Sequence, residues 1–213
     1  QQIASAPAVL WVRGTAPTGN VAAVVGTRNP TRAGVDRIHK VVSVLVSADY
    51  GVVSGLATGV DTAAHEAALA EGGQTWAYLG SGVDLPTPRE NINLADRIVS
   101  AGGGLLAEVD LGTKPSSRTL VARDRLQSGT SSLTVIGQSG IPSGTLHTAR
   151  FTIEQERRLV VVAPPASEAN DPAWAGNMAL CDPGGCDPAI LNASGHLAER
   201  IAARRPVADD VLT

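Results

Sequence analysis

The sequence contains little of several residue types that mark common classes of protein. Aromatic residues make up only 3% of the 213 residues, and Lys40 and Lys114 are the only lysines among 17 basic residues. The formal net charge is −3, so the chain does not attract polyanions through its overall charge. Any contact with a polyanion therefore depends on a local cluster of arginines.

Cysteines and long apolar runs are also scarce. The two cysteines, Cys181 and Cys186, lie in a CDPGGC segment without a second Cys or His pair at ligand spacing. This favours two simple thiols over a metal site or a local disulfide. No apolar run approaches the roughly 18 residues that span a bilayer, and no charged leader precedes an apolar core. We therefore expect a soluble cytoplasmic protein with no membrane contact, no metal and no cofactor.

What the sequence does contain is a repeated alternation of short apolar segments with helical patterns. Hydrophobic residues make up 43% of the chain, and the predicted strands include VAAVV, YGVV, QTWAY, SLTVI and LVVVA. Each of the first four is followed by a loop rich in glycine or serine and then by helical spacing. This alternation predicts an α/β fold whose mostly parallel sheet carries helices on both faces.

The length and the hydrophobic content indicate one domain over residues 1–213. We expect its core over about residues 8–163. Residues 166–190 are rich in Pro, Gly and Asp and predict an irregular excursion, and residues 191–213 predict a terminal helix and a tail.

Four loops follow predicted strands and should meet at one edge of the sheet. In an open α/β sheet such loops line one crevice, where backbone N–H groups and helix N-termini favour phosphate. A glycine in any one of these loops is more often explained by backbone geometry, but the four loops together predict a phosphate site. They comprise Gly26, Thr27 and Arg28; Ser54 and Gly55 of SGLATG; Gly80, Ser81 and Gly82; and Ser143, Gly144 and Thr145.

Several catalytic motifs are missing. GTRNPTRAG is neither GxGxxG nor GxxxxGK[ST], and the chain holds no GxSxG or HExxH. His65 follows Asp61 by four residues on a predicted helix, which fits either an acid/base pair or a helix-start carboxylate beside a packed histidine. We assign no catalytic residue.

Four arginines lie at or just beyond the loops of the expected ligand edge, and Arg28 directly follows a strand. Together with Asn91 of the PREN segment, these are candidate ligand contacts: Arg28, Arg89, Arg123 and Arg125. Guanidinium groups suit phosphate because their planar N–H donors can bind two phosphate oxygens at once.

The motifs resemble those of the DNA-processing protein A family, also called DprA or Smf. The resemblance runs from about residue 8 to residue 163 through VLWVRG, VVGTRNPT, YLGSGVD, PREN, ARDRLQSGTS and SGTLHTAR, and SGLATGVDTAAH is its most specific element. Weaker matches are the WAGN segment at 174–177 and the terminal Asp-Val-Leu. The resemblance implies the family's extended Rossmann-like domain alone, without its helical N-terminal domain or winged helix.

The resemblance also implies a function. Members bind single-stranded DNA without strong sequence preference, load RecA during natural transformation, act as dimers and have no established catalytic turnover. By position, Arg28 matches the basic residue of the VGSR-type loop, Arg89 the one before Glu-Asn, and Arg123 and Arg125 those of the RNRI-type helix. These arginines would hold phosphates with backbone donors from Ser54, Gly55, Ser143 and Gly144.

Two positions depart from the family pattern. Leu120 stands where the family usually has Phe, which removes a base-stacking contact worth roughly 1 to 3 kcal/mol. Asp124 replaces the usual Asn and puts a negative charge between Arg123 and Arg125. These changes fit a divergent or mobile-element member of the family.

Two other classes of function stay open. One is a nucleotide-binding or nucleotide-hydrolysing protein, similar to phosphoribohydrolases or nucleotide sensors. Against it, IPSGTLHTAR has no Glu three residues after Thr145, where those enzymes carry PGGxGTxxE. The other is a purely structural or interaction protein with a degenerate site.

Overall fold

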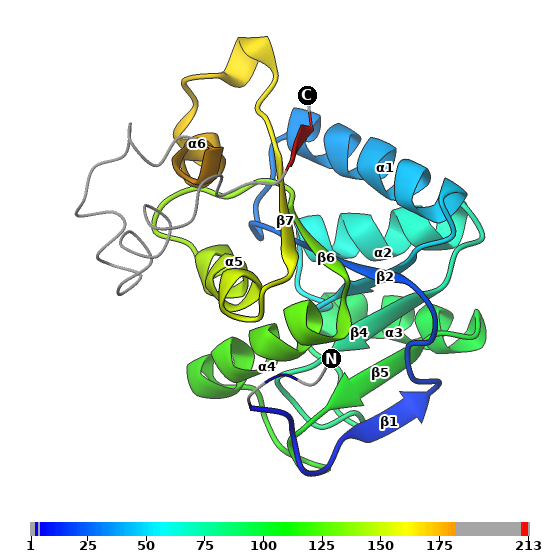
Figure 1. The fold of residues 1–213 in the computed structure, drawn as a ribbon. Coiled ribbons are helices and arrows are strands. Elements are labelled where there is room, and N and C mark those ends of the chain that lie inside the picture. The colour runs from blue at the N-terminus through cyan, green and yellow to red at the C-terminus, as the bar shows by residue number, and fades with distance from the viewer. Residues whose placement is uncertain (1–2, 4, 182–209, 213) are drawn as a thin grey trace.

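The chain folds into a three-layer α/β structure (Figure 1). The computed structural model describes residue 3, residues 5–181 and residues 210–212, the last three by their backbone only.

An eight-stranded sheet forms the middle layer, in the order β1-β5-β4-β3-β2-β6-β7-β8. Strand β1 pairs antiparallel with β5, and every other pair is parallel. This confirms the predicted α/β fold with a mostly parallel sheet. The strands are β1 (Trp11–Gly14), β2 (Val21–Val25), β3 (Gly51–Ser54), β4 (Thr75–Tyr78), β5 (Gly104–Ala107), β6 (Leu133–Ile136), β7 (Arg158–Val162) and β8 (Asp210–Leu212).

Helices cover both faces of the sheet (Figure 1). One face carries α1 (Arg32–Ser47), α2 (Val60–Ala70) and α3 (Ile92–Ser100), and the other carries α4 (Ser117–Thr130), α5 (Thr145–Glu154) and α6 (Ala175–Cys181). Short 3₁₀ turns occur at η1 (Arg89–Asn91), η2 (Ala166–Glu168) and η3 (Pro172–Trp174).

Strand β2 shows why the sequence adopts this arrangement. All five of its residues are apolar and buried, because alternate side chains enter opposite layers. Val24 packs with Ile38 and Val42 of α1, whereas Val25 packs with Leu146 of α5. A strand that is apolar on both faces is stable only between two layers of helices.

The chain changes direction at β2. From β2 it proceeds outward through β3, β4 and β5, and α4 then returns it to β6, on the other side of β2. The connections that leave β2 and β6 therefore diverge, and this topological switch point opens a crevice at the carboxyl ends of the two strands.

The described part of the expected excursion, residues 166–181, contains two 3₁₀ turns and α6, and Trp174 and Asn177 anchor it to the sheet. The Trp174 side chain is fully buried, and its indole N–H donates to Glu168. Buried Asn177 donates to the carbonyls of Gly137 and Val162 and accepts the N–H of Ser139.

Strand β8 lies within the expected tail. Residues 182–209, with Cys186 and the whole of the expected terminal helix, lie outside the described residues.

Candidate nucleic-acid interface

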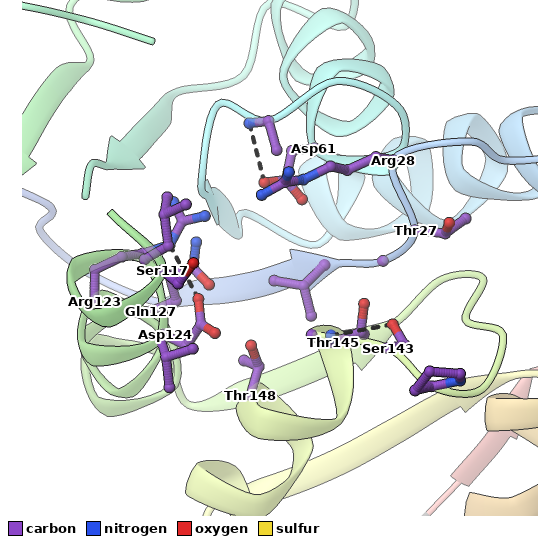
Figure 2. Close-up of a pocket in the computed structure, with 17 residues that line it drawn as sticks. Thr27, Arg28, Asp61, Ser117, Arg123, Asp124, Gln127, Ser143, Thr145 and Thr148 are labelled. Atoms are coloured by element: carbon purple, nitrogen blue, oxygen red, sulfur yellow. Dashed lines mark hydrogen bonds and ion pairs between the residues drawn. The ribbon is translucent and has the colours of Figure 1, made fainter. Parts of the chain in front are cut away.

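A cleft of about 440 Å³ opens at the switch point between β2 and β6 (Figure 2). Its walls come from the loop after β2, the loop before α5 and one face of α4. The lining residues are Val25, Gly26, Thr27, Arg28, Ala57, Asp61, Ser117, Leu120, Val121, Arg123, Asp124, Gln127, Pro142, Ser143, Gly144, Thr145 and Thr148.

A second cleft of about 320 Å³ adjoins the first. It is lined by Gly55, Thr58, Thr87, Pro88 and Pro115, together with residues that also line the first cleft: Arg28, Ala57, Leu120 and Arg123. These shared residues lie where the two clefts meet, and exposed Arg28 forms the ridge there, so we treat the two clefts as one groove along this edge of the sheet. We call it the edge groove.

The loop after β2 places Arg28 on that ridge. A Cβ on Gly26 would lie 2.6 Å from Val60 Cγ2, so only glycine fits where the strand ends. The N–H of Thr27 donates to Gln138 O at 2.7 Å, and the carbonyl of Thr27 accepts the N–H of Val60 at 3.0 Å. The loop is thereby held on both sides, and the exposed Arg28 side chain extends over the first cleft toward Asp61 (Figure 2).

The loop of residues 54–59 is held from within. The Ser54 hydroxyl is buried and donates to the carbonyl of Val24. Asp61 Oδ2 accepts the N–H groups of Gly55 and Ala57 at 3.1 and 3.2 Å. Asp61 therefore acts as a cap for this loop at the start of α2.

Asn91 holds the same loop from the other side. Its Nδ2 donates to the carbonyl of Leu56 at 2.8 Å, to that of Ala57 at 3.2 Å and to the Thr62 hydroxyl at 2.8 Å. The side chains of Ser54 and Asn91 therefore position the loop, and neither lines the groove.

Arg123 lies at the bottom of the groove and has internal partners. The residue is only 6% exposed; its Nη1 donates to the carbonyls of Gly55, at 2.7 Å, and Tyr78, and its Nε donates to Asp124 at 3.0 Å. Gly55 leaves no space for a Cβ because the guanidinium packs against it. In this structure Arg123 joins α4 to the ends of β3 and β4.

Two carboxyl groups lie beside this guanidinium. Burial raises the pKa of Asp61, partly offset by Arg123 and by hydrogen bonds to the carboxylate. Burial also raises the pKa of Asp124 to about 6; Arg123 opposes this shift and Asp61 adds to it. Arg28 also lowers the pKa of Asp124, so the guanidinium groups of both Arg123 and Arg28 act on this carboxyl group.

Asp61 and His65 do not form the pair that one interpretation of the sequence allowed. His65 Nδ1 lies 2.7 Å from the Thr75 hydroxyl, and burial lowers the pKa of His65 to about 3. His65 is fully buried and lines neither cleft. It is therefore the packed histidine of the other interpretation.

The remaining arginines lie away from the clefts. Arg125 forms a two-point ion pair with Glu108 at 2.8 and 2.5 Å and donates to Ser5 O. Arg89 is exposed on the short turn η1. Neither lines either cleft, so contact of these two residues with phosphate stays a prediction.

The loop of residues 80–82 is packed inward. Gly80, Ser81 and Gly82 are buried; Gly80 lies against Leu120, and the Ser81 hydroxyl donates to Leu85 O. None of the three lines either cleft.

The loop before α5, in contrast, forms a wall of the first cleft. Ser143, Gly144 and Thr145 all line it, and Ser143 Oγ accepts the N–H of Thr145 at 3.2 Å (Figure 2). Helix α5 begins there, so its positive dipole end faces the cleft.

The sequence analysis missed most of the contribution of α4 and α5. Leu120, Asp124 and Gln127 recur at spacings of four and three residues, so they share the groove-facing side of α4. Thr148 lies one turn into α5. The polar residues at helical spacing were the signal that could have identified this wall.

Two classes of site have no support in the described part of the chain. None of its helices is both long and apolar enough to cross a bilayer. Its His, Cys, Asp and Glu residues form no group of three that could hold a metal ion.

The chain is similar to known proteins in sequence and in fold. Among curated relatives, protein Smf of Synechocystis is 36% identical over 149 residues, which are 69% of this chain and 37% of that protein. The DNA processing protein DprA of Bacillus subtilis is 34% identical over 159 residues, 73% and 53% of the two chains. The chain thus spans about half the length, or less, of these relatives.

Solved structures show the same fold. DNA processing protein A from Streptococcus pneumoniae superposes with a TM-score of 0.69 at 29% identity, covering 87% of this chain and 61% of that one. The Helicobacter pylori protein, whose single-stranded DNA binding mode has been examined structurally, gives 0.75 at 23% identity, covering 95% and 91%.

The family model described as DNA recombination-mediator protein A matches residues 1–191. This match covers the whole sheet except β8 and every residue of the edge groove. The chain therefore belongs to the DNA recombination-mediator protein A family.

Proposed function

We propose that this chain binds single-stranded DNA along the edge groove, largely independently of sequence. The observation that carries the proposal is Arg28, an exposed cation on the ridge shared by two adjoining clefts. A strand that crosses this ridge would put a phosphate beside Arg28 and another near the start of α5. The family membership and the Helicobacter pylori relative, whose single-stranded DNA binding mode has been examined, support this choice of ligand.

The test is binding of a labelled all-thymine oligonucleotide, measured by fluorescence anisotropy over a range of salt concentrations. We expect affinity to fall with salt, and Arg28→Ala to bind more weakly with the slope of log affinity against log salt reduced by about 1. Arg97→Ala is the matched control, because Arg97 is an exposed arginine of α3 that pairs with Glu66 and lines neither cleft. Equal binding by Arg28→Ala and wild type would overturn the proposal.

The wider role follows from the family. We propose that the chain acts as a homodimer in the cytoplasm and helps RecA to assemble on the bound strand during recombination. The test measures RecA filament growth on DNA coated with single-strand binding protein, with and without this chain. No acceleration would remove the RecA role and leave DNA binding intact, and sedimentation would test the dimer.

A second candidate is binding or hydrolysis of a free nucleotide. The observation that favours it is the pair of carboxyl groups with raised pKa in the first cleft, Asp61 and Asp124, since a protonated carboxyl can act as a general acid. Incubation with nucleoside monophosphates, followed by chromatography for free base, tests it. Under our main proposal no free base is released.

A further inference from the structure

The charges inside the first cleft differ from those on its rim. The interior holds the carboxyl groups of Asp61 and Asp124 and the guanidinium of Arg123, which is engaged with Asp124 and two backbone carbonyls; Arg28 acts on Asp124 from the rim. A phosphate in the interior would therefore meet two carboxyl groups and a guanidinium whose donors are largely used inside the protein. The rim, with exposed Arg28, is where phosphate is favoured, so the interior suits an uncharged group rich in hydrogen-bond donors.

Two side chains of α4 present hydrogen-bonding groups to that interior. Asp124 accepts a hydrogen bond from Arg123 through Oδ1, and within the described residues its Oδ2 has no donor. Gln127, one turn further along α4, is 1% exposed and lines the cleft, and among the residues that the structure describes its Nε2 has no hydrogen-bond partner. A buried amide N–H without a partner is costly, and a ligand that supplies an acceptor would remove that cost.

An apolar surface flanks these groups. Leu120 and Val121 line the same cleft, on the helix that carries Asp124. They offer a face for a flat ring, while the polar edge of the ring reaches Asp124 and Gln127. A nucleobase has this combination of an apolar face and a hydrogen-bonding edge.

Among the four DNA bases, guanine fits a carboxylate best. Its Watson–Crick edge places the N1–H beside the N2 amino group, so the two oxygens of one carboxylate can accept from both. Its neighbouring O6 can accept from an amide such as that of Gln127. Adenine and cytosine offer a single amino group, and the N3–H of thymine lies between two carbonyls that a carboxylate repels.

We propose that the first cleft holds one base of the bound strand and prefers guanine, with Asp124 accepting from its N1 and N2 and Gln127 beside its O6. This proposal rests on the single-stranded DNA binding proposed above. It adds a preference at one nucleotide to an affinity that the phosphates supply regardless of sequence.

The experiment compares two oligonucleotides short enough to occupy one groove. One is all thymine, and the other carries a single guanine at its centre; a third, with hypoxanthine at the centre, lacks only the N2 amino group. We expect the guanine strand to bind about tenfold more tightly than the thymine strand, with hypoxanthine between them. Equal affinities for guanine and thymine would overturn the proposal.

A conservative variant tests the assigned residue. Asp124→Asn keeps the size of the side chain, and we expect it to lose the guanine preference while it binds the thymine strand at least as tightly as wild type. Asp36→Asn is the control, because it removes the same charge from an exposed position on α1. A guanine preference that persists in Asp124→Asn would overturn the assignment.

The outcomes separate this proposal from the one on which it rests. Binding that depends on Arg28 and on salt, but not on the central base, would leave the DNA-binding proposal standing and remove this one. No binding of any oligonucleotide would remove both. Thermal unfolding of each variant shows that a lost preference does not come from a lost fold.

Discussion

Arg28 and Arg123 line the same groove, but their surroundings give them opposite roles. Arg28 is exposed on the ridge, whereas Arg123 is buried and donates to two backbone carbonyls and to Asp124. A guanidinium whose donors are used inside the protein contributes to its architecture, and an exposed one is available to a ligand. Burial, rather than residue type, therefore separates the arginine that is used inside the protein from the one whose donors are free for a ligand.

The largest expected effect on stability comes from replacing the buried Arg123. Arg123→Ala should lower the free energy of unfolding by about 3 to 5 kcal/mol, because it leaves buried carboxyl groups without their cation. Urea denaturation measures this. Arg123→Lys keeps the positive charge but not the planar guanidinium, so its free energy of unfolding should lie between those of wild type and Arg123→Ala. A loss below about 1 kcal/mol would show that Arg123 is not a structural residue.

The next effect concerns the pH dependence contributed by Asp124. Its pKa rises from 3.8 to about 6 in the folded protein, so this group favours folding below about pH 4, and its contribution is lost as the pH rises through about 6. Asp124→Asn should therefore gain stability relative to wild type over this window, by about 2 to 3 kcal/mol.

Denaturation midpoints across the window measure this difference. Arg123, Asp61 and Arg28 also act on the Asp124 carboxyl and are present in both proteins, so the difference between the two curves isolates Asp124. A difference that does not change with pH would contradict the prediction.

Arg125 is less buried than Arg123 and less exposed than Arg28, so its replacement should have an intermediate effect on stability. Arg125→Ala removes a partly buried two-point ion pair with Glu108 and should lower stability by about 1 kcal/mol. Since Arg125 lines neither cleft, we also expect little change in oligonucleotide affinity. A large loss of affinity in a folded variant would return Arg125 to the set of phosphate contacts.

The smallest effect on stability is expected at the rim. Arg28→Ala should change the free energy of unfolding by less than about 0.5 kcal/mol, because the side chain is exposed. Its effect belongs to DNA affinity instead, as described above. Thermal unfolding measures the change in stability. A strongly destabilised Arg28→Ala would show that Arg28, like Arg123, has a structural role.

The sequence was sufficient for the fold because strands such as VAAVV are apolar on both faces, and only helices on both sides of a sheet can cover them. It also placed Arg28 at the carboxyl edge, because the residue directly follows a buried strand. The spacing of Arg123 and Arg125 argues against a shared binding site for both. Residues two apart on a helix point to different sides, so both could hardly face one groove.

Other parts of the site could not be predicted from local sequence. A Ser or Asn beside a glycine-rich loop can face a ligand or hold the loop, and only the tertiary partners decide. Ser54 and Asn91 hold the loop through carbonyls of β2 and of residues 56 and 57. Asn177 is similar, since its partners lie on two separate segments, after β6 and at the end of β7, that become its neighbours only in the folded chain.

Gln138 connects the two sides of the first cleft. Its backbone carbonyl accepts the N–H of Thr27 at 2.7 Å, and its side-chain Oε1 accepts the N–H of Thr31 at 2.8 Å. The loop that carries Arg28 is thus fastened to the segment that leads from β6 to α5. The walls of the first cleft are thus fixed relative to each other before any ligand binds, so a ligand that binds between them would cost the protein little conformational entropy.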